Sequence, residues 1–103
     1  MNTPKFRMYV LTRLDLATLY RAVQGGHALA AFSYEHEVTW RHWNNSTLVY
    51  LGVRNLVEMN AWKEALSGMT KEFSYFREPD QMDAITAIAC YDSGEIFSKL
   101  PLA

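Results

Sequence analysis

The feature that most limits the possible folds of this chain is a short apolar segment typical of a strand. It is followed by a segment whose apolar residues have the spacing of a helix, and not by a second strand. In Phe6–Leu11 apolar side chains become nearly continuous toward the end, which is typical of a strand covered on both faces. The next segment rich in strand formers is Thr47–Val53, which is too short for a buried helix. A strand joined to later strands through helices predicts a mostly buried mixed sheet with helices on both faces.

The segment between these strands has the spacing of a helix. Asp15 or Thr18 is placed to cap its start, because either side-chain oxygen accepts a free amide hydrogen of the first turn. The pair Gly25-Gly26 lies inside the helix, where each glycine costs about 1 kcal/mol relative to alanine. Close approach to a ligand, or packing of the helix on the sheet, would justify that cost. One face of the helix, at i, i+4, i+7 and i+8, is formed by Ala22, Gly26, Leu29 and Ala30.

The second half of the chain predicts further helices. A short helix is expected over Glu37–Trp43. Asn55 followed by Glu58 resembles a capping box and opens a helix to about Leu66. A last short helix is expected over Gly94–Leu100, stopped by Pro101. The buried stripe of the helix after Asn55 is predicted to consist of Met59, Trp62, Leu66 and Met69.

Two more strands complete the predicted fold. Glu72–Arg77 and Ala84–Tyr91 are joined by the turn Glu78–Asp83, which suits a hairpin-like antiparallel connection. The chain is thus predicted to be one α/β domain over residues 1–103. Its three layers hold a mixed four-stranded sheet with helices on both faces, in the order β-α-α-β-α-β-β-α.

Composition limits the function classes. The 103 residues are 50% hydrophobic and 20% charged, which suits one globular core. The formal net charge of −1 argues against a domain that binds a nucleic acid through many phosphate contacts, because such domains usually have an excess of basic residues. No stretch approaches the ~20 apolar residues of a membrane span, and Met1–Lys5 lacks the apolar stretch of a secretory signal. A cytoplasmic protein without membrane contact is expected, and Cys90, the single cysteine, is predicted to be a reduced core thiol.

Two neighbouring motifs carry a resemblance to a known family. Leu11–Leu16 reads Leu-Thr-Arg-Leu-Asp-Leu, and Ala22–Ala28 reads Ala-Val-Gln-Gly-Gly-His-Ala. These resemble the Arg-x-Asp-Leu strand end and the Ala-Ala-Gln-x-x-His-Ala helix of the type-2 peptidyl-tRNA hydrolases, and the likeness extends from about Phe6 to Leu102. Glu78-Pro79, with Thr86 opening the last strand, resembles the divergent peptidyl-tRNA hydrolase domain-containing relatives.

The chain also departs from that family. Tyr20, with Arg21 beside it, stands where typical active members have a lysine four residues ahead of the glutamine. The family's Asp-Ala-Gly loop is shortened and rewritten as Glu78–Asp83. Arginine can replace a lysine as a cation but cannot replace an ammonium that must titrate.

The resemblance implies hydrolysis of the ester between a peptidyl group and tRNA. Such a reaction needs a positioned water, a base and donors for the carbonyl oxygen. Asp80 or Asp83 would then act on the water, Arg21 would hold negative charge, and Thr86 would orient the water. Aspartates at a turn also bond the backbone commonly. The substrate-binding residues implied by the resemblance are Arg13, Asp15, Tyr20, Gln24, His27 and Glu78.

Other site types are weighed against this one. The three histidines lack the i, i+4 spacing of metal ligands, and neither a metal nor a cofactor is expected. Arg13, Asp15, Arg21 and Arg77 form an alternative anion-binding set at the sheet edge. The aromatics around Trp40 and Trp43 would stack on bases, anchor a homodimer or simply fill the core.

Three functions therefore stay open. The first is the ester hydrolase, and the second is a non-catalytic binder of a nucleotide, a small signalling molecule or an RNA end. The third is an interaction module. The hydrolase requires that the turn Glu78–Asp83 fold back toward the start of the glycine-bearing helix, with Asp80, Asp83 and Arg21 around one pocket.

Overall fold

The computed structural model describes residues 5–103; residues 1–4, which open the segment examined for a secretory signal, lie outside the described residues. The chain forms β1 (Arg7–Arg13), α1 (Thr18–Glu35), α2 (Glu37–Trp43), β2 (Leu48–Val53), α3 (Leu56–Gly68), β3 (Phe73–Glu78), the 3₁₀ turn η1 (Pro79–Gln81), β4 (Ala84–Asp92) and the 3₁₀ turn η2 (Glu95–Phe97).

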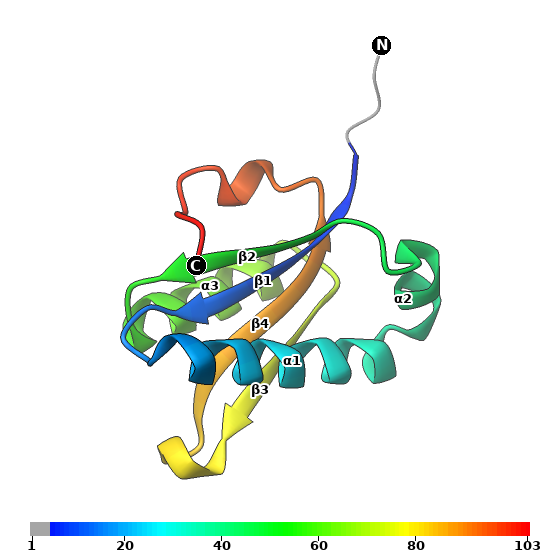
Figure 1. Cartoon of the computed structure of the whole chain (residues 1–103). Helices are drawn as coiled ribbons and strands as arrows, with labels where there is room; N and C mark the ends of the chain where they lie inside the picture. The colour runs from blue at the N-terminus through cyan, green and yellow to red at the C-terminus, as the bar shows by residue number, and fades with distance from the viewer. Residues whose placement is uncertain (1–4) are drawn as a thin grey trace.

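The four strands form one mixed sheet in the order β2-β1-β4-β3. β1 pairs in parallel with β2 and antiparallel with β4, and β3 pairs antiparallel with β4. Helix α1 crosses one face of the sheet, with α2 at its end, and α3 covers the other face (Figure 1). This three-layer α/β arrangement confirms the predicted fold class.

Two cores hold the layers together, one on each face of the sheet. Alternate side chains of β1 divide between them, since successive strand residues point to opposite faces. Met8 and Val10 pack with Phe32 on the α1 side, whereas Tyr9 and Leu11 join the core on the α3 side. Cys90 lies fully buried in the α3-side core, where burial raises its pKa to about 12. At neutral pH it is therefore a protonated core thiol, as predicted.

The predicted face of α1 is wrong. Ala22, Gly26 and Ala30 are exposed, and the buried residues of the helix are Gln24, Gly25, Ala28 and Phe32. Small apolar side chains gain little from burial, whereas Phe32 gains much, so the large ring sets which side of α1 meets the sheet. The polar Gln24 lies in the same buried stripe. A prediction based on the spacing of apolar residues therefore does not find this stripe.

Other local expectations have mixed outcomes. The span of α2 is as predicted, and the Asn55 side chain accepts a hydrogen bond from the Glu58 amide at the start of α3. The predicted cap of α1 is wrong, because Ala17 occupies that position and provides no side-chain bond. Met69 is 48% exposed instead of buried. The last helix is only the turn η2.

Gly25 and Gly26 have different surroundings although they are neighbours in α1. A Cβ atom at Gly25 would lie 2.6 Å from Cε2 and Oη of Tyr50, whereas one at Gly26 would meet nothing within 4 Å. Close packing of Tyr50 on the helix backbone therefore explains Gly25. Gly26 carries the helix cost of glycine without a packing reason.

We expect Gly26→Ala to raise the free energy of unfolding by about 1 kcal/mol, because alanine favours the helix and enters open space. Gly25→Ala is the matched variant, and it should be neutral or destabilising because Tyr50 must move. Urea unfolding followed by circular dichroism measures both. Equal stabilisation by the two variants would contradict the close packing of Tyr50.

Candidate functional site

A β-bulge turns Thr86 toward α1. Phe76 of β3 pairs with Ala87 of β4, and the next residue, Arg77, pairs with Ile85, so Thr86 is the extra residue. Ala87 faces the α1-side core and Ile85 the α3-side core. The bulge breaks the alternation between them, and Thr86 reaches the α1 side, where its hydroxyl bonds Gln24. Bulges are common next to functional sites because they re-aim a side chain in this way.

A chain of hydrogen bonds joins α1 to the β3–β4 hairpin. The hydroxyl of Thr86 donates to Oε1 of Gln24, and Nε2 of Gln24 donates to Oε1 of Glu78 at 3.2 Å. The hydroxyl of Tyr20 donates to the same Glu78 oxygen, also at 3.2 Å. Thr86 and Gln24 are fully buried, whereas Glu78 and Tyr20 are partly exposed. The chain thus runs from the core to a carboxylate that solvent can reach.

The pKa of Tyr20 is raised by its surroundings in this site. Desolvation raises its pKa above the usual value of 10.0, and the hydrogen bond to the Glu78 carboxylate raises it further. The Asp80 carboxylate contributes in the same direction. At neutral pH Tyr20 is therefore protonated, and its hydroxyl is a hydrogen-bond donor beside Glu78.

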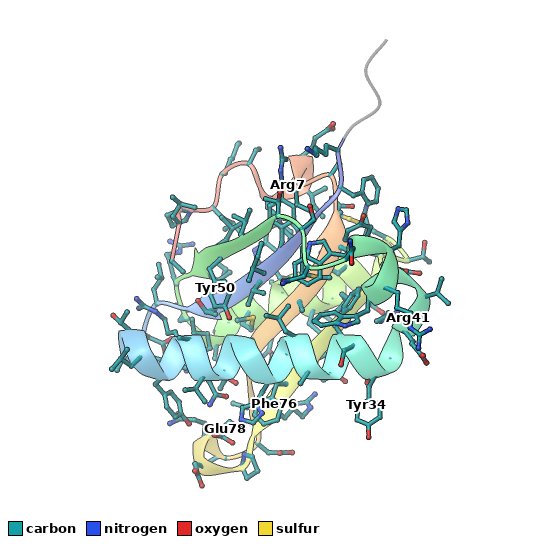
Figure 2. All side chains as sticks on the ribbon, turned by 45° about the vertical axis from the view of Figure 1, so that its right-hand side comes forward. Arg7, Tyr34, Arg41, Tyr50, Phe76 and Glu78 are labelled. Atoms are coloured by element: carbon teal, nitrogen blue, oxygen red, sulfur yellow. The ribbon has the colours of Figure 1, made fainter. Side chains whose placement is uncertain are left out.

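His27 forms a platform next to these polar groups. Its ring stacks on Phe76, with 4.3 Å between ring centroids and 12° between planes. Tyr20, Gln24 and His27 recur at i, i+4 and i+7 on α1, so they share the side of the helix that faces β3. Figure 2 shows Phe76 and Glu78 together on that side of α1. We call Tyr20, Gln24, His27, Glu78 and Thr86, with Phe76, the hairpin-side site.

The two aspartates lie at the tip of the hairpin. Asp80 belongs to η1, and Asp83 follows it with a positive φ of 63°. Both side chains are exposed. The backbone carbonyl of Asp83 accepts a hydrogen bond from Arg77 at 3.3 Å. Glu78, and neither aspartate, is the carboxylate that is bonded to Gln24 and Tyr20.

Arg21 lies on the flank of α1 that is nearer β2. It lines a cavity with Thr12 and with Tyr50 of β2, and Tyr50 and Glu78 lie on opposite sides of the helix (Figure 2). β2 and β3 are the two edges of the sheet. The structure therefore does not bring Asp80, Asp83 and Arg21 around one pocket.

The expected anion-binding set is not assembled either. Arg13 forms a two-pronged ion pair with Asp15, at 3.0 and 2.8 Å, and this bond holds the Asp15 pKa below its usual value. Strand alternation puts Arg13 on the α3 side, because Thr12 lies on the α1 side. The Arg77 guanidinium lies over the ring of Tyr75. These arginines are thus separated from Arg21.

The aromatic residues of α2 belong mainly to the core. Trp43 is 4% exposed, and its Nε1 donates to the Thr47 carbonyl at 2.9 Å. Trp40 is partly buried against Trp43, with 5.2 Å between ring centroids. Core filling is the reading that fits Trp43.

Among residues 5–103, the structure contains no group of three or more His, Cys, Asp or Glu side chains that could hold a metal ion. In the same range, no helix has the length and apolar character needed to cross a bilayer. The chain matches none of the protein-family models with which it was compared, and no curated protein matches it significantly.

Sequence reasoning missed Phe76, Thr12 and Tyr50 as site residues. Each lies in a strand of mostly apolar residues and reads as part of the core. One signal was available for Gln24, because Gln24, Ala28 and Phe32 recur at i, i+4 and i+8. A polar side chain in such a stripe indicates a buried hydrogen-bonded group.

We expect Thr86→Val to lower the free energy of unfolding by about 1–3 kcal/mol, because the Gln24 carbonyl oxygen would stay buried without its donor. Thr12→Val is the matched control. Thr12 is also fully buried, but its hydroxyl has no partner among the described residues, so its removal should be neutral or stabilising. Chemical unfolding of both variants measures the difference, and equal losses would contradict the Thr86–Gln24 bond.

Proposed function

We propose that the protein is a peptidyl-tRNA hydrolase-like ester hydrolase that acts in the cytoplasm and uses the hairpin-side site. This site replaces the expected pocket of Asp80, Asp83 and Arg21, which the structure does not assemble, so the catalytic roles differ from those expected from the sequence. The observation that carries the proposal is the convergence of Gln24, Glu78 and Thr86, at 3.2 Å between Gln24 Nε2 and Glu78 Oε1. The Gln24-x-x-His27-Ala28 motif resembles that family, and its glutamine is fully buried in this hydrogen-bond chain. A buried series of hydrogen bonds that ends at a partly exposed carboxylate supports acid–base catalysis by that carboxylate.

Glu78 is the base in this proposal. Its Oε1 accepts the bonds from Gln24 and Tyr20, and no side-chain hydrogen bond to Oε2 occurs among the described residues. Oε2 is thus free to accept a proton from water. The water oxygen bonds to the ester carbonyl carbon, the bond from that carbon to the ribose oxygen breaks, and the proton held by Glu78 passes to the ribose oxygen. The products are a peptide acid and a free tRNA hydroxyl.

The remaining residues have supporting roles. The Tyr20 hydroxyl stays protonated because its pKa is raised, and it donates its one proton to Glu78 Oε1, so it holds the carboxylate in position. Thr86 is fully buried and acts as a positioning residue, because it holds the Gln24 amide toward Glu78. The stacked rings of His27 and Phe76 offer a surface for a terminal base of the RNA.

One observation favours the second candidate, a non-catalytic binder in the same site. Arg21 lies on the flank of α1 nearer β2 and donates to the carbonyls of Leu14 and Leu16 at 3.2 and 3.1 Å. The hairpin-side site therefore lacks the cation that Arg21 was expected to supply. A binder of a nucleotide, a small signalling molecule or an RNA end needs no catalytic cation. It would use the ring platform and the Gln24–Glu78 pair for recognition.

The test is single-turnover hydrolysis of a labelled N-acetyl-aminoacyl-tRNA. We expect Glu78→Gln to slow the reaction about 10²–10⁴-fold, the usual effect of losing a general base. Asp80→Asn is the matched control, since it neutralises a nearby exposed carboxylate, and it should keep the rate within about twofold, as expected for a group that takes no proton in the reaction. Thermal unfolding of both variants confirms that they fold.

Two outcomes would contradict the hydrolase. The first is a loss in Asp80→Asn as large as that in Glu78→Gln, which would move the base to the turn. The second is no turnover by the wild-type protein at micromolar concentration. If saturable binding of the acylated tRNA end nevertheless persisted in that case, the binder would replace the hydrolase.

A further inference from the structure

β3 lies at one edge of the sheet, with β4 as its single neighbouring strand among the described residues (Figure 1). Along such a strand the main-chain groups of successive residues point alternately toward the neighbour and away from it. The Glu72 carbonyl accepts a hydrogen bond from the Tyr91 amide at 3.3 Å, so Glu72 faces β4. By this alternation, the main-chain groups of Phe73, Tyr75 and Arg77 point outward.

The outward-facing groups without a partner form a stretch with defined ends. At the start, the Phe73 carbonyl is bonded to Nε2 of His36 at 2.9 Å. At the end, Pro79 has no N–H to offer. Between these two, the N–H and C=O of Tyr75 and Arg77 have no hydrogen-bond partner among residues 5–103. We call these two donors and two acceptors the free edge of β3.

The side chains beside the free edge favour the addition of a strand. Natural proteins usually cover an exposed strand edge or place lysine and proline on it. Here the ring of Tyr75 packs against the α3-side core and the ring of Phe76 against the α1-side core, and both are only partly buried. An added strand would therefore contact an aromatic ring on each face of the sheet, which stabilises it beyond its main-chain bonds.

The free edge leads directly to the base proposed for the hairpin-side site, because Glu78 is the last residue of β3. A peptidyl group is attached to its ester through its C-terminal carbonyl. An extended peptide parallel to β3 would bring that carbonyl to Glu78, whereas an antiparallel peptide would bring its N-terminus there. Only the parallel orientation fits the reaction.

From this arrangement we propose that the free edge of β3 binds the peptide part of the substrate as an added parallel strand, with the ester carbonyl at Glu78. The inference rests on the proposed ester hydrolysis. Main-chain hydrogen bonds supply affinity without reading side chains, which suits an enzyme whose substrates share only their backbone. The bond between His36 and Phe73 limits the paired part to about four residues, roughly 13 Å at about 3.3 Å per residue.

The first test is amide hydrogen exchange of the full chain, followed by NMR. The probe is N-acetyl-tetraalanine joined by an amide bond to 3′-amino-3′-deoxyadenosine, which keeps the peptide and the terminal nucleoside but lacks the ester. We expect the outward amides of Tyr75 and Arg77 to exchange at least about tenfold more slowly when the probe is bound, because they become hydrogen-bonded. The matched probe has N-methylated alanines, and it should bind about three- to tenfold more weakly because it lacks main-chain donors.

A matched pair of variants tests the protein side of the same bonds. Tyr75→Pro removes an N–H that points away from β4, so the ladder to β4 is kept, and proline is tolerated at such edge positions. Tyr75→Ala loses the same ring but keeps the N–H. We expect the proline variant to bind the probe about three- to tenfold more weakly than the alanine variant. Circular dichroism confirms that both variants fold.

Three results would overturn the added strand. The first is unchanged exchange at Tyr75 and Arg77 in the presence of saturating probe. The second is equal probe affinity of Tyr75→Pro and Tyr75→Ala. The third is slow exchange of these amides without probe in a protein that sediments as a dimer, because a second copy would then occupy the edge.

Hydrolysis is measured separately, so that failure of the reaction and failure of the peptide site can be told apart. With acylated tRNAs of increasing peptide length, we expect kcat/KM to rise about tenfold from one to four residues and then to stay constant. Protection of the edge amides without any hydrolysis would contradict the hydrolase and support the added strand. Hydrolysis that is independent of peptide length, without protection, would support the hydrolase and contradict the added strand.

Discussion

The hydrogen bonds of one buried amide determine how the rest of this structure is arranged. Gln24 lies in the helix stripe that packs on the sheet, and a buried amide is stable only when its carbonyl oxygen and its amine both find partners. Thr86 satisfies the oxygen and Glu78 accepts from the amine. Together with the burial of Phe32 on the same face, these bonds fix the rotation of α1 about its axis. Because of that rotation, Tyr20 and His27 face β3, and Arg21 faces β2.

The bulge in β4 is the structural condition for this arrangement. In a regular strand Thr86 would point to the α3 side, since its neighbour Ala87 points to the α1 side. The bulge interrupts the pairing between Phe76 and Arg77 and brings the hydroxyl within reach of Gln24. An apolar residue at position 24 would need no such bulge. The bulge in the β3–β4 ladder and the orientation of α1 thus both accommodate the same polar contact.

The sequence predicted the architecture well and the site only in part. Strand and helix periods depend on local spacing, so the order of elements and the Asn55 cap followed from the chain alone. The orientation of α1 was predicted wrongly, because the buried stripe contains the polar Gln24 and its partners, Thr86 and Glu78, lie far away in the sequence. Glu78 and Thr86 were predicted as site residues, and the structure brings them to Gln24. The predicted partnership of Arg21 with Asp80 and Asp83 depended on which side of α1 each group lies, which sequence spacing alone does not determine.

Helix α1 divides the polar groups of this domain into two sets of opposite character. On the side of β3 the groups converge on the carboxylate of Glu78, and on the side of β2 they surround the guanidinium of Arg21. Arg21 instead donates to the carbonyls of Leu14 and Leu16, in the loop between β1 and α1. The carboxylate and the guanidinium therefore have separate hydrogen-bond partners. The base proposed for ester hydrolysis is thus the carboxylate on the side of β3.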